Sequence, residues 1–225
     1  MQRIVFGSLA YDVAHLLGGA ALLLSFALLS QRRIAALINI YALQATVLAV
    51  AACWQGWVQD APQLYLTGAI AFMAQGVAIP LALHRFARIW RLGGSVETAL
   101  GIFPGMALGV ALVALSILVV LPTTVDAHAL TREDLGLALA VVLLGLLMMI
   151  TRRSAFIQVI GFLSLENGLI LAAVGIEGMP LVVELSVGVL VLVAFAVFGS
   201  FLVRLRARFD SLDTAHLDRV GGAHR

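Results

Sequence analysis

Charged side chains are scarce in this sequence. Only 12% of the 225 residues are charged, whereas a soluble domain carries roughly a quarter, and 62% are hydrophobic. The mean hydropathy is +1.08. A surface so poor in charge does not suit water, so the composition excludes a soluble globular protein and indicates that most of the surface faces lipid.

Lysine is absent altogether, since all fourteen basic residues are arginine. This absence excludes a retinal or pyridoxal Schiff base and a phosphate-loop lysine. The single cysteine, Cys53, excludes an internal disulfide, a CxxC redox pair and a cysteine-ligated iron–sulfur cluster. His15 is the one histidine expected at membrane depth, which leaves a bis-histidine haem unsupported. We therefore expect no cofactor in this chain.

Apolar runs long enough to cross a bilayer, which takes roughly 20 helical residues, recur along the whole chain. They lie near residues 8–29, 34–56, 63–83, 99–121, 135–150, 154–175 and 180–203. The sequence thus predicts an all-α integral membrane protein with seven transmembrane helices. No convincing cleavage site follows Arg3, so the first helix is expected to remain.

Arginines punctuate these runs and indicate their orientation. If the helices alternate, twelve arginines fall on one side, and only Arg3 and Arg132 fall on the other. The positive-inside rule then predicts an outside N-terminus and a cytoplasmic C-terminus. Residues 205–225 can form a cytoplasmic amphipathic tail, which either anchors at the interface or docks on a partner chain.

A sparse internal repeat has an offset of 120 residues. Gln31-Arg-Arg-Ile-Ala-Ala-Leu-Ile resembles Thr151-Arg-Arg-Ser-Ala-Phe-Ile-Gln, and Ala87-Arg88 matches Ala207-Arg208. Two parallel three-helix units, in residues 1–91 and 134–204, would result, because a linking helix in residues 92–133 returns the chain across the membrane. The alternative is coincidence.

The linking helix carries glycines at every fourth position, namely Gly101, Gly105 and Gly109. Such spacing forms a groove that admits another helix closely. The second helix belongs either to this chain or to a neighbouring subunit.

Glu166 is the leading functional candidate, because ionisable groups inside a membrane are costly. It follows Arg153 by thirteen residues, or roughly 20 Å of helix, which places it near mid-membrane. Burial opposes the charged form of a carboxyl, so Glu166 suits a proton relay. Ser164, Asn167 and Gln158 accompany it on the same helix. The alternative is a carboxyl that only fixes helix packing.

Further polar residues extend this candidate proton pathway. Asp12 and His15 share one face near the outer end of the first helix, as an exchange pair or as ordinary solvated groups. Glu184 follows Pro180, where the helix dipole favours a carboxylate. In the first unit, Gln44 takes the place of Glu166, and with Asn39 and Gln75 it is expected to form a polar scaffold.

Three sequence blocks resemble a known family of membrane subunits. They are Ile160-Gly-Phe-Leu-Ser-Leu-Glu-Asn-Gly168, Pro180-Leu-Val-Val-Glu184 and Leu212-Asp-Thr-Ala-His-Leu217. Their order and spacing are similar to those of hydrogenase-4 component E. Residues 152–167 more distantly resemble the three-helix K subunit of respiratory complex I, although Leu163 stands where that subunit has its acid.

The resemblance implies a non-catalytic subunit in the membrane arm of a hydrogenase-4 or formate hydrogenlyase type complex. It implies a bacterial inner membrane location, antiporter-like membrane subunits and a hydrogenase peripheral arm as partners, and no nucleic acid. The nickel–iron site and iron–sulfur clusters would lie on those partners, and Glu166 would be the pathway carboxylate. An independent secondary transporter and an assembly scaffold without an ion role are the alternatives.

Overall fold

The computed structural model describes residues 2–89, 100–123 and 129–175. The chain divides into two units, Met1–Val183 and Glu184–Arg225, and all of the described residues belong to the first. The expected seventh helix at 180–203, Glu184 and the tail at 205–225 therefore lie outside the described residues.

Every regular element in the described ranges is a helix. The elements are α1 (Gln2–Ser30), α2 (Ile34–Val58), α3 (Pro62–Ala71), η1 (Phe72–Ala78), α4 (Ile79–Ile89), α5 (Ile102–Thr123), α6 (Ala129–Thr151) and α7 (Ala155–Val174). The segments α3, η1 and α4 form one continuous rod, so the described residues contain six helices long and apolar enough to cross a membrane. Over these ranges the protein is all-helical, and its apolar helices make it a multi-pass membrane protein.

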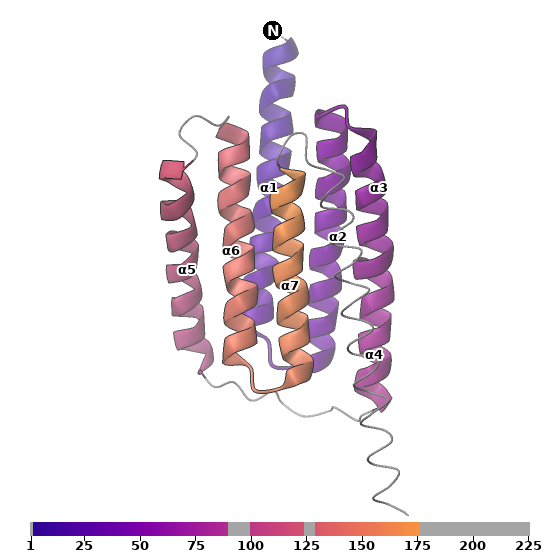
Figure 1. Cartoon of the computed structure of the whole chain (residues 1–225), viewed down its shortest axis with the longest axis vertical. Helices are drawn as coiled ribbons and strands as arrows, with labels where there is room; N and C mark the ends of the chain where they lie inside the picture. Colours follow the sequence, from indigo (N-terminus) through magenta and orange to yellow (C-terminus); the bar gives the residue numbers. More distant parts are fainter. Residues whose placement is uncertain (1, 90–99, 124–128, 176–225) are drawn as a thin grey trace, which may run out of the picture. The chain divides into compact units, whose positions relative to one another are not determined.

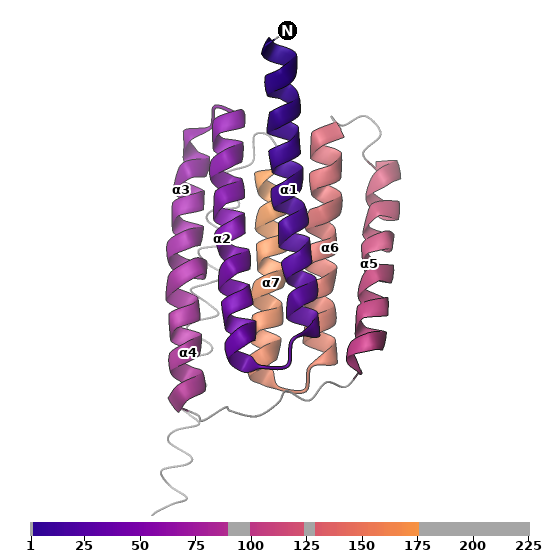
Figure 2. The same ribbon diagram turned by 180° about the vertical axis from the view of Figure 1, so that it is seen from behind.

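The interior is enclosed by four helices. Helix α1 packs on α2 and α6, and α7 packs on α6 and α2. The α3–α4 rod lies along α2, and α5 lies along α6 (Figures 1 and 2). Helices α1 and α6 run in one direction, whereas α2 and α7 run in the other. In the most apolar windows, 61% of α7 is buried but only 17% of α5, so α5 is peripheral.

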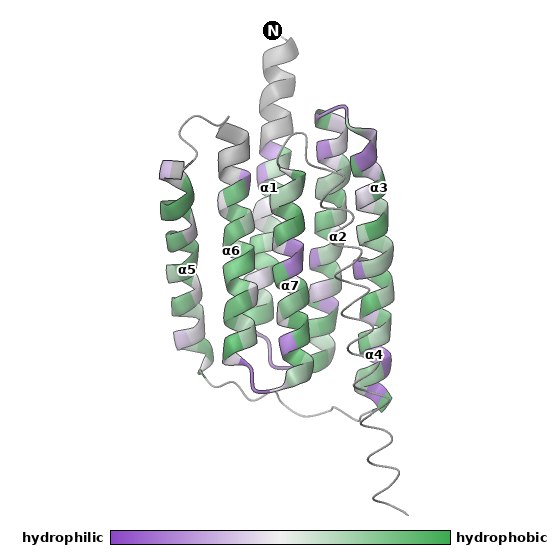
Figure 3. Ribbon diagram, in the orientation of Figure 1, coloured by the Kyte–Doolittle hydropathy of each residue, from purple (hydrophilic) through white to green (hydrophobic). Residues whose placement is uncertain are grey.

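One end of this bundle, called here the arginine end, collects six of the described arginines. The α1–α2 loop carries Arg32 and Arg33, and the α6–α7 loop carries Arg152 and Arg153. The last part of α4, with Arg85 and Arg88, reaches the same end. By contrast, Arg3 and Arg132 belong to the first turns of α1 and α6, at the opposite end. Figure 3 shows hydrophilic residues at the helix ends and within α7.

Glycines bring α6 and α7 into backbone contact. A Cβ atom at Gly145 would lie 2.6 Å from the Leu165 nitrogen, and one at Gly168 would lie 2.8 Å from the Val142 nitrogen. Real side chains do not approach a backbone so closely, so only glycine permits this packing. These two glycines, rather than those in α5, let α6 and α7 pack at backbone distance.

The α5 glycines behave differently from one another. A Cβ at Gly109 would lie 3.0 Å from Phe26 and 3.1 Å from Leu144, so this residue packs against α1 and α6. A Cβ at Gly105 would meet nothing within 4 Å, and one at Gly101 would meet only Pro104 of the same helix. The expected groove is thus filled within the described chain at Gly109 alone.

The wide π-helical segment η1 ends at Ala78, two residues before Pro80. Proline lacks the N–H that would continue the regular ladder, and such bulges accompany that loss. The side chain of Gln75 lies in this turn and is buried. The α3–α4 rod therefore carries an amide inside the fold, on the side where η1 packs against α2.

Candidate functional site

A set of buried polar side chains from α1, α2 and α7 forms what we call the central polar cluster. Its members are Ser25, Tyr41, Gln44, Ser164, Glu166 and Asn167, each no more than 3% exposed. Two of its pairs, Tyr41 with Gln44 and Ser164 with Asn167, are spaced three residues apart, which places each pair on one helix face. The three helices thus direct polar groups into an otherwise apolar interior.

A line of amide hydrogen bonds connects the three helices. The Asn167 Nδ2 donates to Gln44 Oε1 at 3.4 Å, and the Gln44 Nε2 donates to Ser25 Oγ at 2.8 Å. Ser25 in turn donates to the carbonyl oxygen of Ala21 at 3.0 Å. Since the Gln44 oxygen accepts while its nitrogen donates, one amide joins α7 to α1 through α2.

Glu166 lies beside this line and is 2% exposed. Its Oε1 has no hydrogen-bond partner among the described residues, and the same holds for Tyr41 OH, Ser164 Oγ and Asn167 Oδ1. Each unpaired buried polar atom costs about 1–3 kcal/mol, so these four atoms make the cluster costly in a dry interior.

The other two amides expected to form a polar scaffold, Asn39 and Gln75, have no hydrogen bond to this cluster within the described residues. Asn39 is exposed on α2. Gln75 is 1% exposed in η1, and its Oε1 has no partner among the described residues. Of the three amides expected to form a polar scaffold, only Gln44 has a hydrogen bond to α7 within the described residues.

At the arginine end, Arg152 is nearly fully buried and contacts the end of α1. Its Nη2 donates to the carbonyl oxygens of Leu29 at 2.7 Å, Gln31 at 2.8 Å and Leu28 at 3.3 Å. A cation suits the negative end of a helix, where carbonyl groups lack partners. Burial, and to a lesser degree the neighbouring Arg32, lower the pKa of this guanidinium.

Gln158 belongs to the arginine end rather than to the central polar cluster. Its Nε2 donates to the Arg152 carbonyl oxygen at 2.8 Å. It precedes Glu166 by eight residues, or about 12 Å of helix. Gln158 therefore fixes the α6–α7 loop. It lies away from Glu166, which it was expected to accompany in a proton pathway.

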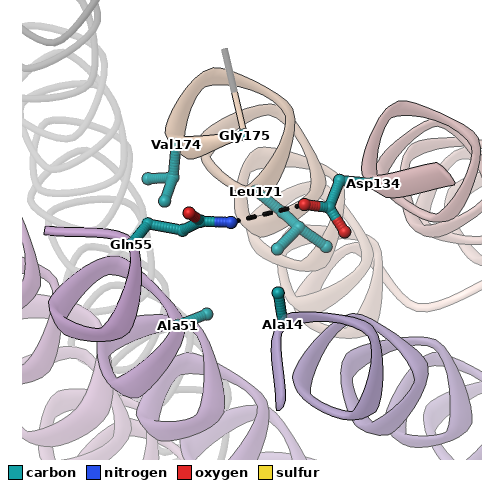
Figure 4. A pocket seen from close by; sticks show the side chains of 7 residues that line it. All are labelled: Ala14, Ala51, Gln55, Asp134, Leu171, Val174 and Gly175. Carbon is teal, nitrogen blue, oxygen red and sulfur yellow. Dashed lines mark hydrogen bonds between the residues drawn. The ribbon is translucent and has the colours of Figure 1, made fainter. Parts of the chain in front are cut away.

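A small pocket at the opposite end of the bundle contains a carboxylate that sequence analysis overlooked. Asp134 is 8% exposed, and its Oδ2 accepts a hydrogen bond from Gln55 Nε2 at 3.4 Å. The residues lining this Asp134 pocket are Ala14, Ala51, Gln55, Asp134, Leu171, Val174 and Gly175 (Figure 4). A signal was present, because Asp134, Ala138 and Val141 follow the helical spacing of buried positions.

Asp12 and His15 are exposed on α1, on either side of the pocket residue Ala14 in the sequence. They lie at the same end of the bundle as Asp134. Glu184 is outside the described residues. Within the part of the chain that the structure describes, no group of three or more His, Cys, Asp or Glu residues could hold a metal ion.

The fold and the central polar cluster define the chain as a multi-pass membrane protein with a buried carboxyl. No family model matches the sequence, and no solved structure matches it. The chain is 31% identical over 207 residues to the uncharacterized protein Rv0085 of Mycobacterium tuberculosis, covering 87% of this chain and 90% of that protein. It belongs to the same family as Rv0085.

Proposed function

We propose that this chain is a non-catalytic membrane-arm subunit of a complex-I-like hydrogenase, of the hydrogenase-4 or formate hydrogenlyase type. In this role it takes part in proton translocation and in assembly of the membrane arm. The observation that carries the proposal is the burial of Glu166 in the central polar cluster of a membrane protein. The sequence around Glu166 resembles hydrogenase-4 component E, and this resemblance indicates which type of complex the chain would belong to.

The proton role follows from the surroundings of Glu166. An ionised carboxyl inside a membrane is costly unless it is paired, and none of the other five members of the cluster carries a positive charge. Uptake of a proton removes that cost, and release restores the charge, while the amides of Gln44 and Asn167 bind connecting water. Glu166 thus alternates between carboxyl and carboxylate without any redox change in this chain.

The expected position in the membrane arm is supported by α5 and by the arrangement of the arginines. Helix α5 is the least buried of the described spans, and a Cβ at Gly105 would meet nothing within 4 Å. We infer that antiporter-like subunits cover this surface, and that the hydrogenase peripheral arm lies beyond the arginine end. That end would face the cytoplasm, in a bacterial inner membrane. The shared directions of α1 with α6 and of α2 with α7 support two parallel repeats.

Glu166→Gln in the intact complex tests the proton role, because glutamine keeps the size and hydrogen bonding but cannot titrate. Asp60→Asn is the matched control, since Asp60 is an exposed acid in the α2–α3 turn. We expect Glu166→Gln to retain hydrogen chemistry with artificial electron carriers and to lose most of the proton gradient, measured with a quenched pH dye. The control should form the gradient normally.

Two other results would favour the competing functions. An unchanged gradient in an assembled Glu166→Gln complex would reduce this carboxyl to a packing role. The partner proposal is tested by Gly105→Leu, which should weaken co-purification with antiporter-like subunits. Recovery of the wild-type chain alone, with ion transport in liposomes, would contradict the subunit role and establish a secondary transporter.

A further inference from the structure

We propose that the arginine end holds a phosphate-binding site, in which Arg152 and Arg32 bind the phosphate group of an anionic membrane lipid. The inference is independent of the proton role of Glu166. It concerns the buried guanidinium of Arg152, whose contacts with the end of α1 leave part of its hydrogen-bonding capacity unused. A phosphate ion from solution would offer the same oxygen atoms, and the test separates these two sources.

Arg152 is a buried cation with unused donors. Its side chain is 2% exposed. One nitrogen, Nη2, makes its described hydrogen bonds, to the carbonyl oxygens of Leu28, Leu29 and Gln31. Nε and Nη1 are also buried, and neither has a partner among the described residues. Buried donors without an acceptor are costly, above all on a charged group. A negative group with several oxygen atoms would satisfy them.

The described helix ends around Arg152 supply no carboxylate as a counter-ion. Helices α2, α5 and α7 have no acidic residue in their first turns, and α1, α4 and α6 have none in their last turns. The loops at 31–33 and 152–154 contain only glutamine, arginine and serine. Burial, and then the charge of Arg32, lower the pKa of Arg152. Within the part of the chain that the structure describes, the positive charge at this end is therefore not neutralised.

The two arginines lie at the depth of lipid phosphate groups. The apolar span of α6 ends at Thr151 and that of α1 at Ser30, so Arg152 and Arg32 follow directly or almost directly. The headgroup layer begins where the hydrocarbon core ends, and basic pockets between transmembrane helices bind lipid headgroups on the cytoplasmic side. A lipid brings its phosphate to this depth without leaving the bilayer, which favours a lipid over a free ion.

The backbone of Arg152 is held on both sides, which fixes the base of its side chain before a ligand arrives. Its N–H donates to the Met148 carbonyl oxygen at 3.2 Å, and its carbonyl oxygen accepts from Gln158 Nε2 at 2.8 Å. Arg32 is exposed, and a long arginine side chain has many rotamers. Because Nε and Nη1 are buried, a phosphate reaches them only when neighbouring side chains turn aside. It then pairs with the fixed Arg152 and the movable Arg32.

Native mass spectrometry of the full chain in mild detergent tests the site. Phosphatidylglycerol is the probe, and galactosyl diacylglycerol, which has no phosphate, is the comparison lipid. We expect the wild type to retain phosphatidylglycerol more strongly, by on the order of tenfold. Arg32→Gln should weaken this retention about fivefold. Arg88→Gln, the same change at another exposed arginine of this end, should leave it unchanged.

Arg152→Gln should remove the preference for phosphatidylglycerol altogether. Since this variant also loses the contact with the end of α1, Arg32→Gln keeps the inference testable if Arg152→Gln does not fold. Equal retention of the two lipids by the wild type would exclude a lipid as the source of the phosphate. Equal weakening by Arg32→Gln and Arg88→Gln would show general attraction between charges and would overturn the inference.

Inorganic phosphate, compared with chloride at equal ionic strength, tests the other source. A melting temperature that phosphate raises in the wild type, but not in Arg32→Gln, would support the site with a free ion as its ligand. Equal retention of the two lipids, together with no difference between phosphate and chloride, would overturn the inference. Neither outcome bears on the proton gradient, so the proposed function is tested separately.

Discussion

The side chains of Gln44 and Asn167 meet in the centre of the bundle, although 123 residues separate them in the sequence. Asn167 donates to Gln44 at 3.4 Å, and both residues are no more than 2% exposed. Gln44 belongs to α2 and Asn167 to α7. Their contact connects α7 to α2 through polar side chains, one residue along α7 from Glu166.

This contact should have a measurable coupling energy. We expect a double-mutant cycle of Gln44→Leu and Asn167→Leu to give about 0.5–1.5 kcal/mol, since interhelical hydrogen bonds in membranes are modest. Thermal unfolding of the full chain in mild detergent measures it. Pairing Asn39→Leu with Asn167→Leu is the control, because Asn39 is exposed, and that pair should be additive. A coupling near zero in the first cycle would contradict the hydrogen bond.

The α6–α7 contact should fail when its glycines gain a side chain. We expect Gly145→Ala to lower stability by about 1–3 kcal/mol, because the added methyl group would overlap the Leu165 backbone. Gly105→Ala is the control, since a Cβ there meets nothing within 4 Å. The comparison uses the melting temperatures of the purified chains. Equal melting temperatures would show that α6 and α7 pack less closely than described.

Arg152 should matter more than its exposed neighbour Arg153. We expect Arg152→Gln to destabilise the fold by about 1.5–3 kcal/mol, because the carbonyl oxygens at the end of α1 lose a charged donor. Arg153→Gln, a substitution at an exposed position, should change stability by less than about 0.5 kcal/mol. Chemical unfolding measures the stability of both variants. Similar losses of stability would argue against the contact between Arg152 and the end of α1.

The orientation proposal predicts opposite labelling at the two ends of the bundle. In a Cys53→Ala background, Asp60→Cys should react with an impermeant maleimide added outside intact cells. Arg153→Cys should react only after the membrane is opened, because the positive-inside rule places the arginine end in the cytoplasm. Labelling of Arg153→Cys in intact cells would invert the topology.

The helices were predictable from sequence because lipid demands long apolar runs, and six of the seven expected runs are helices in the described residues. Their ends were less predictable. Helix α6 begins at Ala129 rather than near 135, since polar residues continue a helix beyond the apolar core. Asp134 was missed for that reason.

The burial of Glu166 was predictable from its position in an apolar run, but its neighbours were not. Helical spacing relates Ser164 to Asn167, yet it does not tell which residues of another helix face them. The Gln44 contact and the close approach of Gly145 to Leu165 depend on tertiary packing. Arg152 was expected among cytoplasmic loop residues, and it is buried because the carbonyl groups of α1 provide acceptors there.

The Arg152 contact has a consequence for synthesis of the chain. The carbonyl oxygens at the end of α1 accept from a side chain made 121 to 124 residues later. At a synthesis rate of roughly 5–20 residues per second, Arg152 is made on the order of 10 s after these carbonyl groups. The first hairpin must meanwhile keep that end hydrated at the membrane surface. The carbonyl groups at the end of α1 therefore gain their buried donor only after α6 has been synthesised.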